Sequence, residues 1–256
     1  MLPKNFIDRY GQEPKKFVID KLREFDYVVL GDTHNEIALD EFVLQLIPKL
    51  SKQGKFKLHL ELEDFLQGYI EEYMKTGDEG NLQKVIERQR ELVRRGYPFE
   101  ERITGPYFDI IRESRKDGAE VIAIDDNCDK DNGSELIQNL RRSDEHMVKN
   151  LSGSGLVYAG ELHFEAYDLR LWNYKTRYRI MQETISMNKD NRTYGLTNAM
   201  RPLLNGHSVA FDLTQKEVRD MIDFFHEQMS RDEHEFVPPF CSVKPYLRFE
   251  GLIYHP

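Results

Sequence analysis

Short apolar runs recur along the chain and alternate with segments that favour helix. The runs at 27–30, 121–124 and 156–159 are almost wholly apolar, which is typical of strands buried on both faces of a parallel sheet. Segment 37–50 places its apolar residues near helical spacing, and 136–151 is expected to form a further helix. This alternation predicts an α/β fold in which a mainly parallel sheet is flanked by helices in three layers.

The second predicted strand differs from the others because its residues alternate. Segment 56–62 places apolar residues on one face and polar residues, including His59 and Glu61, on the other. A strand with one buried face is therefore expected, in which His59 is a hydrogen-bonded strand residue. Glu63 and Asp64 are expected to cap the helix that follows, because acidic residues favour the first turn.

A long polar, helix-favouring block occupies residues 64–117. Glycine and proline end or kink helices, so the block should divide where they occur. We interpret it as a helical insert of three helices after the second strand, interrupted at Gly77, Gly80, 96–98 and 105–106.

The remaining third of the chain has a less regular pattern. Residues 170–186 and 216–229 are expected to be helical, and 208–211 and 247–254 to be strands. No low-complexity linker or block of charge separates a second domain. We therefore expect one domain over residues 1–256, with the insert as part of it.

Composition narrows the class of protein. The chain has 39% hydrophobic and 32% charged residues, as in ordinary soluble globular proteins, and no run of about 18 apolar residues that could span a membrane. A net charge of −9 argues against binding to nucleic acid, which requires a basic surface. The N-terminus lacks the features of a secretory signal, so a cytoplasmic location is expected, with Cys128 and Cys241 reduced.

The predicted strands end in groups that can bind a ligand. In parallel strands these ends meet at one edge of the sheet, where α/β proteins gather their chemistry. A single Gly-x-x-His motif after a strand is often accidental, but here two occur at equivalent strand ends, with carboxylates at the ends between them. Imidazole and carboxylate together suit Zn, Mn, Fe or Co. The groups are Gly31-Asp32-Thr33-His34, Glu61, Asp125 and Gly160-Glu161-Leu162-His163. Other histidines, such as His146 and His255, are expected at the surface.

These motifs resemble those of the ChaN-like haem-binding uptake proteins, which are relatives of the erythromycin esterases and the Tiki metalloproteases. The family's first motif is commonly Gly-Glu-x-His, and here aspartate stands at position 32. The ordered resemblance covers residues 27–165, together with a closing strand. It rests on 28–35, on Glu61 with Gln67 and 73–77, on the helix segment 142–147, on 158–163 and on 249–254.

The resemblance implies a three-layer α/β fold with a pocket at the strand ends and, for the Tiki and esterase branches, a hydrolytic site. His34, Glu61 and His163 take the metal-ligand or catalytic positions, for a divalent transition ion such as Mn, Zn, Co or Fe. Asp32 or Glu161 is expected to activate a bound water for attack on an ester or amide of a small-molecule or peptide substrate. Asp125 is expected to orient a ligand histidine or to complete the shell of ligands, and Arg142 to stabilise developing negative charge.

A haem-binding protein is the alternative hypothesis, because the ChaN branch binds haem. Haem requires an axial ligand, for which Tyr158 and Tyr167 are candidates. The absence of an export signal argues against an uptake role. A scaffold that kept the fold and lost the chemistry is a third hypothesis, and a homo-oligomer is left open.

Overall fold

The structure, a computed structural model, describes residues 3–32, 37–97, 99–126, 136–160, 163, 177–184, 204, 206–232 and 249–255. Two compact units divide the chain: Lys21–Arg177 form the larger, and Met1–Asp20 with Tyr178–Pro256 form the smaller. Two N-terminal helices, α1 (Pro3–Tyr10) and α2 (Pro14–Glu24), precede the first strand. Among the described residues, no helix is long and apolar enough to cross a bilayer.

Four parallel strands form the sheet of the larger unit. They are β1 (Tyr27–Asp32), β2 (Lys57–Glu63), β3 (Glu120–Asp125) and β4 (Gly155–Gly160), in the spatial order β3-β2-β4-β1. Since β4 lies between β1 and β2, the two Gly-x-x-His motifs follow neighbouring strands, with Asp32 opposite Gly160 in the register. The mainly parallel α/β fold expected from the sequence is confirmed.

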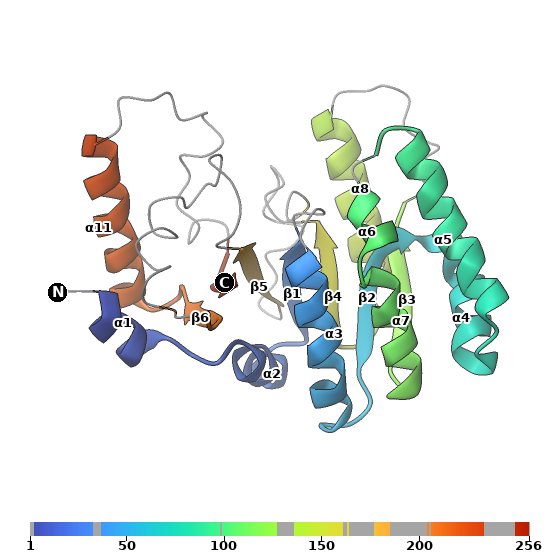
Figure 1. Cartoon of the computed structure of the whole chain (residues 1–256), viewed down its shortest axis with the longest axis horizontal. Coiled ribbons are helices and arrows are strands. Elements are labelled where there is room, and N and C mark those ends of the chain that lie inside the picture. Colours follow the sequence, from blue (N-terminus) through green and yellow to red (C-terminus); the bar gives the residue numbers. More distant parts are fainter. Residues whose placement is uncertain are drawn as a thin grey trace. The chain divides into compact units, whose positions relative to one another are not determined.

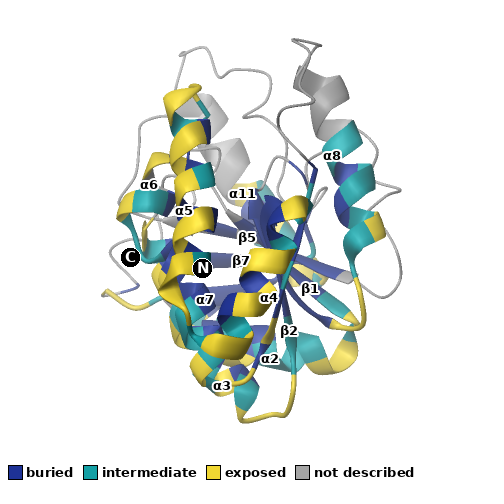
Figure 2. Cartoon of the chain, turned by 90° about the vertical axis from the view of Figure 1, so that its right-hand side faces the viewer, coloured by how far each residue is buried: buried dark blue, intermediate teal, exposed yellow. Residues whose placement is uncertain are grey.

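The helices of this unit cover both faces of the sheet. Parallel crossovers are right-handed, so two crossovers in opposite directions place their helices on opposite faces. The chain moves one way from β1 through β2 to β3 and then returns to β4. Helices α3 (Ile37–Ser51) and α7 (Tyr107–Lys116) accordingly pack together on one face (Figure 1). In Figure 2 helix α8 (Leu136–Asn150) lies on the other side of the strands. The expected three layers are present.

Strand β2 is buried on both faces, so the expectation of a half-buried strand is wrong. Beyond Lys57 all its residues are buried, the polar ones included. They can be buried because each has a partner inside the protein. The two ring nitrogens of His59 each lie 3.3 Å from a backbone carbonyl, of Leu156 and of Ser152, and burial lowers the pKa of the ring. The hydrogen-bonded strand histidine is confirmed.

The insert follows β2 as a 3-10 turn, Asp64–Leu66, and four helices, rather than the three expected. The breaks at Gly77, 96–98 and 105–106 occur as expected, but the last two enclose a short additional helix. Gly77 ends the first helix in a left-handed conformation, with φ 76°. Gly80 interrupts nothing, because it lies inside the first turn of the second helix. The helices are α4 (Gln67–Thr76), α5 (Glu79–Arg94), α6 (Glu100–Thr104) and α7.

Gln67, the first residue of α4, contacts the backbone of β3. Its side-chain oxygen accepts a hydrogen bond from the Ala123 N–H at 2.8 Å, and its side-chain nitrogen donates to the Val121 carbonyl at 3.2 Å. Strand β3 is the last in the described sheet order. The side-chain amide of Gln67 thus forms hydrogen bonds with β3 on the side where no other described strand lies next to it.

The described residues of the smaller unit form three strands. In its spatial order β5-β7-β6, strand β5 (Arg177–Thr184) is parallel to β7 (Gly251–His255), and β6 (Val209–Asp212) is antiparallel to β7. Helix α11 (Lys216–Asp232) follows β6 as expected. The helix expected at 170–186 is wrong over 177–184, which is a strand, and the rest of that segment is outside the described residues.

Buried polar pairs explain this error. Arg179 of β5 binds Glu250 through two hydrogen bonds, of 2.5 and 3.0 Å. His255, expected at the surface, is buried, with Nε2 3.2 Å from the Gln182 side-chain oxygen and Nδ1 3.3 Å from the Ser208 hydroxyl. Because most of these buried polar groups have partners inside the unit, polar residues in this part of the sequence do not mark exposed positions.

Candidate functional site

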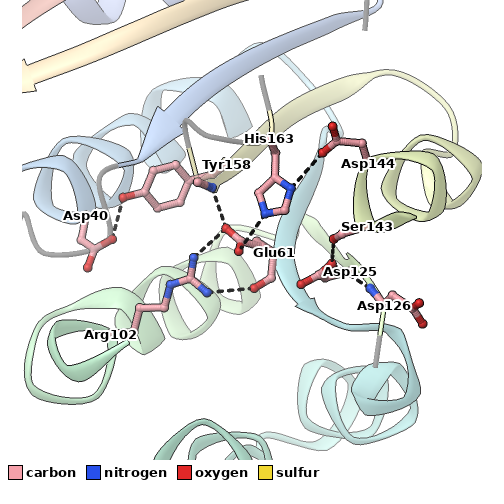
Figure 3. Close-up of polar contacts among 10 residues, drawn as sticks. Asp40, Glu61, Arg102, Asp125, Asp126, Ser143, Asp144, Tyr158 and His163 are labelled. Atoms are coloured by element: carbon pink, nitrogen blue, oxygen red, sulfur yellow. Dashed lines mark hydrogen bonds and ion pairs between the residues drawn. The ribbon is translucent and has the colours of Figure 1, made fainter. Parts of the chain in front are cut away.

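The carboxyl ends of the parallel strands bring three of the expected site residues together. Glu61 lies near the end of β2, Asp125 ends β3, and His163 follows β4. In Figure 3 the imidazole of His163 lies between the carboxylates of Glu61 and Asp144. Of the remaining expected site residues, His34 and Glu161 are outside the described residues, and of Asp32 only the backbone is described, at the end of β1.

Glu61 is held from several sides although it is buried. Its Oε2 accepts hydrogen bonds from the Gly160 N–H at 2.5 Å and from Arg102 Nη2 at 2.8 Å. Its Oε1 lies 3.4 Å from His163 Nε2. Charge-assisted hydrogen bonds of this kind stabilise an ionised carboxylate in a buried place. One carboxylate oxygen is thus used for anchoring, and the other is directed at the histidine.

His163 is buried with a carboxylate on each side of its ring. Nδ1 lies 2.9 Å from Asp144 Oδ1, on α8, and the Asp144 side chain has no exposed surface. Burial by itself would lower the pKa of His163, but the hydrogen bonds to Asp144 and Glu61 outweigh it and hold the pKa well above its usual value. A carboxylate on the far ring nitrogen fixes the orientation of an imidazole that acts as a base or a metal ligand.

Asp125 has partners other than the histidine. Its Oδ1 accepts hydrogen bonds from the Ser143 hydroxyl and from the Asp126 N–H. Burial, together with the negative charge of Glu61, raises the pKa of Asp125 to about 6. The residue that orients His163 is therefore Asp144, not Asp125, and a place for Asp125 in a shell of ligands stays a prediction.

The other expected site residues are engaged elsewhere. Arg142 lies with Nε 3.1 Å from Asp126 Oδ2, and its role in stabilising negative charge stays a prediction. The Tyr158 hydroxyl donates to Asp40 Oδ1 at 2.7 Å, and both side chains are buried. Tyr167 is outside the described residues. Tyr158 thus has a buried partner, and its axial role toward haem iron stays a prediction.

Two residues that contact the site, Arg102 and Asp144, were not singled out from the sequence. Asp144 lies within the helix segment 142–147 on which the family resemblance partly rests, so that motif carried a signal for it. Arg102 carried none, because it is one of many arginines in a polar helical block, and no spacing relates it to Glu61. Its role depends on a contact between segments far apart in the chain.

The two central donors fit a divalent ion. Among the described residues no group of three or more His, Cys, Asp or Glu side chains is placed to hold a metal. His163 Nε2 and Glu61 Oε1 are 3.4 Å apart, and neighbouring donors in a tetrahedral zinc shell lie about 3.3 Å apart. Asp144 on the far ring nitrogen supplies the usual support of a metal-bound histidine. The expected third donor, His34, lies outside the described residues.

Comparison with known proteins yields similarity of fold. No family model and no curated protein sequence matches the chain. A Bacillus cereus protein of solved structure is similar with a TM-score of 0.63 at 10% identity, covering 98% of this chain and 96% of that one. The whole chain therefore shares the fold of a solved protein.

Two further solved structures are similar at lower scores. ChaN of Campylobacter jejuni, solved with cofacially bound haem, has a TM-score of 0.44 at 13% identity, over 68% of this chain and 87% of that one. RRSP, a MARTX toxin effector domain from Vibrio vulnificus, has a TM-score of 0.45 at 20% identity, over 60% of this chain and 31% of that one.

Proposed function

We propose that the chain hydrolyses an ester or amide bond of a small molecule or peptide, with a water activated at Glu61 and His163. The observation that carries this proposal is the orientation of His163, whose Nδ1 is held by the buried Asp144 while Nε2 is directed at Glu61 Oε1. Hydrolytic sites use this arrangement, because a fixed imidazole next to a carboxylate can position a water and take its proton.

The residues around the site have different roles in the proposed reaction. Arg102 and the Gly160 N–H hold Oε2 of Glu61, so Oε1 is the oxygen that faces His163 and is placed to bind a water or an ion next to it. Asp144 keeps the imidazole in place while its charge changes. Proton transfer by positioned groups of this kind accelerates hydrolysis by about 10²–10⁴-fold.

We further propose that Glu61 and His163 hold a divalent transition ion, with His34 as a third ligand. When bound, such an ion lowers the pKa of a coordinated water and polarises the carbonyl under attack. The donor set supports this proposal, since it pairs an imidazole nitrogen, backed by a carboxylate, with a carboxylate oxygen.

Metal content and esterase activity test the proposal together. Protein purified without chelator should contain about one divalent transition ion per chain and hydrolyse p-nitrophenyl esters or chromogenic amides. Glu61→Gln and His163→Asn should each lower kcat by about 100-fold or more. The matched control is His146→Asn, which changes a histidine paired with Asp64 at 2.9 Å, in a contact that does not involve Glu61 or His163. Unchanged metal content and activity in both site variants would overturn the assignment.

Haem binding is the alternative, and it has a separate readout. Tyr158 is bonded to Asp40, so the test uses the other tyrosine candidate, Tyr167. A Soret shift that saturates near one or two haems per chain, lost in Tyr167→Phe, would support haem handling. Together with nil metal and nil hydrolysis, it would replace the hydrolase proposal.

A further inference from the structure

Arg102 is a buried arginine enclosed by aromatic rings. Its side chain is 2% exposed, and its guanidinium carbon lies 4.4 Å from the ring centre of Phe99 and 5.0 Å from that of Tyr107. Burial of a guanidinium is costly unless the charge is paired, and stacking on aromatic rings restricts its plane. The structure therefore holds this group in one orientation.

Two hydrogen bonds of this guanidinium go to one residue, Glu61. Arg102 Nη2 donates to Glu61 Oε2 at 2.8 Å, and Nη1 donates to the Glu61 backbone carbonyl at 3.1 Å. One bond holds the carboxylate and the other holds the backbone from which that carboxylate extends. Together with the Gly160 N–H on the same Oε2, they fix the rotation of the carboxylate, and Figure 3 shows its other oxygen directed at His163.

We propose that Arg102 is a positioning residue of the site, through which the helical insert sets the direction of Glu61 Oε1 toward His163. This inference rests on the proposed function of Glu61 and His163. Arg102 comes from α6, which packs between α5 and α7, so the position of Glu61 depends on the folding of the insert as well as on β2. A shift of the carboxylate by about 1 Å is enough to lower a rate by about 100-fold.

A second arginine of the insert offers a matched control. Arg88 of α5 binds Glu63, two positions after Glu61 on the same strand, with Nε to Oε2 at 2.6 Å and Nη2 to Oε1 at 2.8 Å. Both side chains are nearly buried, as in the Arg102 pair. If Arg102 only stabilises the fold, replacing Arg102 or Arg88 should affect His163 alike. If Arg102 positions Glu61, only the replacement of Arg102 should affect His163.

The experiment compares Arg102→Ala and Arg88→Ala in the full chain. Long-range ¹H–¹⁵N spectra of the histidine rings report on His163 Nε2, whose signal is identified by its loss in His163→Asn. We expect Arg102→Ala to move this signal in the direction that Glu61→Gln moves it, and Arg88→Ala to leave it unchanged. With p-nitrophenyl acetate, Arg102→Ala should lower kcat by about 100-fold with KM within about twofold, while Arg88→Ala retains the wild-type kcat.

Arg102→Lys keeps the charge but lacks the planar fork, so it should restore the His163 signal only in part. If Arg102→Ala does not fold, Arg102→Lys decides the matter by the same spectrum. An unmoved His163 signal in the folded Arg102 variants, or an equal movement in Arg88→Ala, would overturn the proposal. If the wild type hydrolyses no ester, the proposed function fails, whereas the spectrum still decides the role of Arg102.

Discussion

The stability of the smaller unit should depend on pH through His255. This histidine is buried at the end of β7 with Gln182 and Ser208 as partners, and burial, with the nearby positive charge of Lys15, lowers its pKa from 6.5 to about 4. Between these values the unfolded chain binds a proton that the folded chain does not. Stability due to neutral His255 is therefore complete above about pH 6.5 and is lost as the pH falls toward 4.

The magnitude follows from the two pKa values. The pKa of His255 is 6.5 in the unfolded chain and about 4 in the folded chain. This difference lowers the free energy of unfolding by about 2 kcal/mol at pH 5 and about 3 kcal/mol at pH 4, relative to pH 7. Asp125 acts in the opposite sense, because its pKa is raised, so folding favours its protonated form. The contribution of His255 must therefore be isolated by a difference between two proteins.

The assay is urea unfolding, followed by circular dichroism, of the wild type and His255→Gln at pH 7, 5 and 4. The glutamine does not titrate, so the advantage of the wild type over the variant should shrink by about 3 kcal/mol between pH 7 and pH 4. A difference between wild type and His255→Gln that stays constant with pH would refute the reasoning.

Three further predictions concern the larger unit. Arg88→Ala leaves the buried carboxylate of Glu63 without this guanidinium and should lower the free energy of unfolding by about 3–5 kcal/mol in urea titrations. Tyr158→Phe removes the hydrogen bond to Asp40, and the thermal transition should reflect a loss of about 1–3 kcal/mol. Gly155→Ala adds a Cβ that would overlap a backbone carbonyl of β2, so we expect a loss of about 3 kcal/mol or insoluble protein, measured by soluble yield and unfolding.

Three strands of the larger unit could be predicted because burial and apolar character coincide in them. The runs at 27–30, 121–124 and 156–159 are strands, each extended by one or two residues at its ends. Strands buried on both faces must be apolar unless their polar groups have partners, so a continuous apolar run is a dependable signal. The helix expected at 170–186 failed over β5, where Arg179 and Gln182 are polar and buried.

The candidate site, too, could be predicted from the sequence only in part. Glu61 and His163 could be brought together from sequence, since each lies at or just beyond the carboxyl end of a parallel strand. The contacts that define their chemistry could not, because Asp144 and Arg102 come from helices whose rotation and packing no local pattern encodes. Glu63 illustrates this point, since it was expected to cap a helix but makes no cap and binds Arg88 of a later helix.

The hydrogen bonds of Gln67 to β3 have a consequence for the protein at high concentration. The outermost strand of a sheet offers its backbone groups to strands of other molecules, which is a route to polymers and amyloid. Here a strand from another chain would first have to displace the Gln67 amide from Val121 and Ala123. One side chain of the insert thus closes part of this edge to a strand from another molecule.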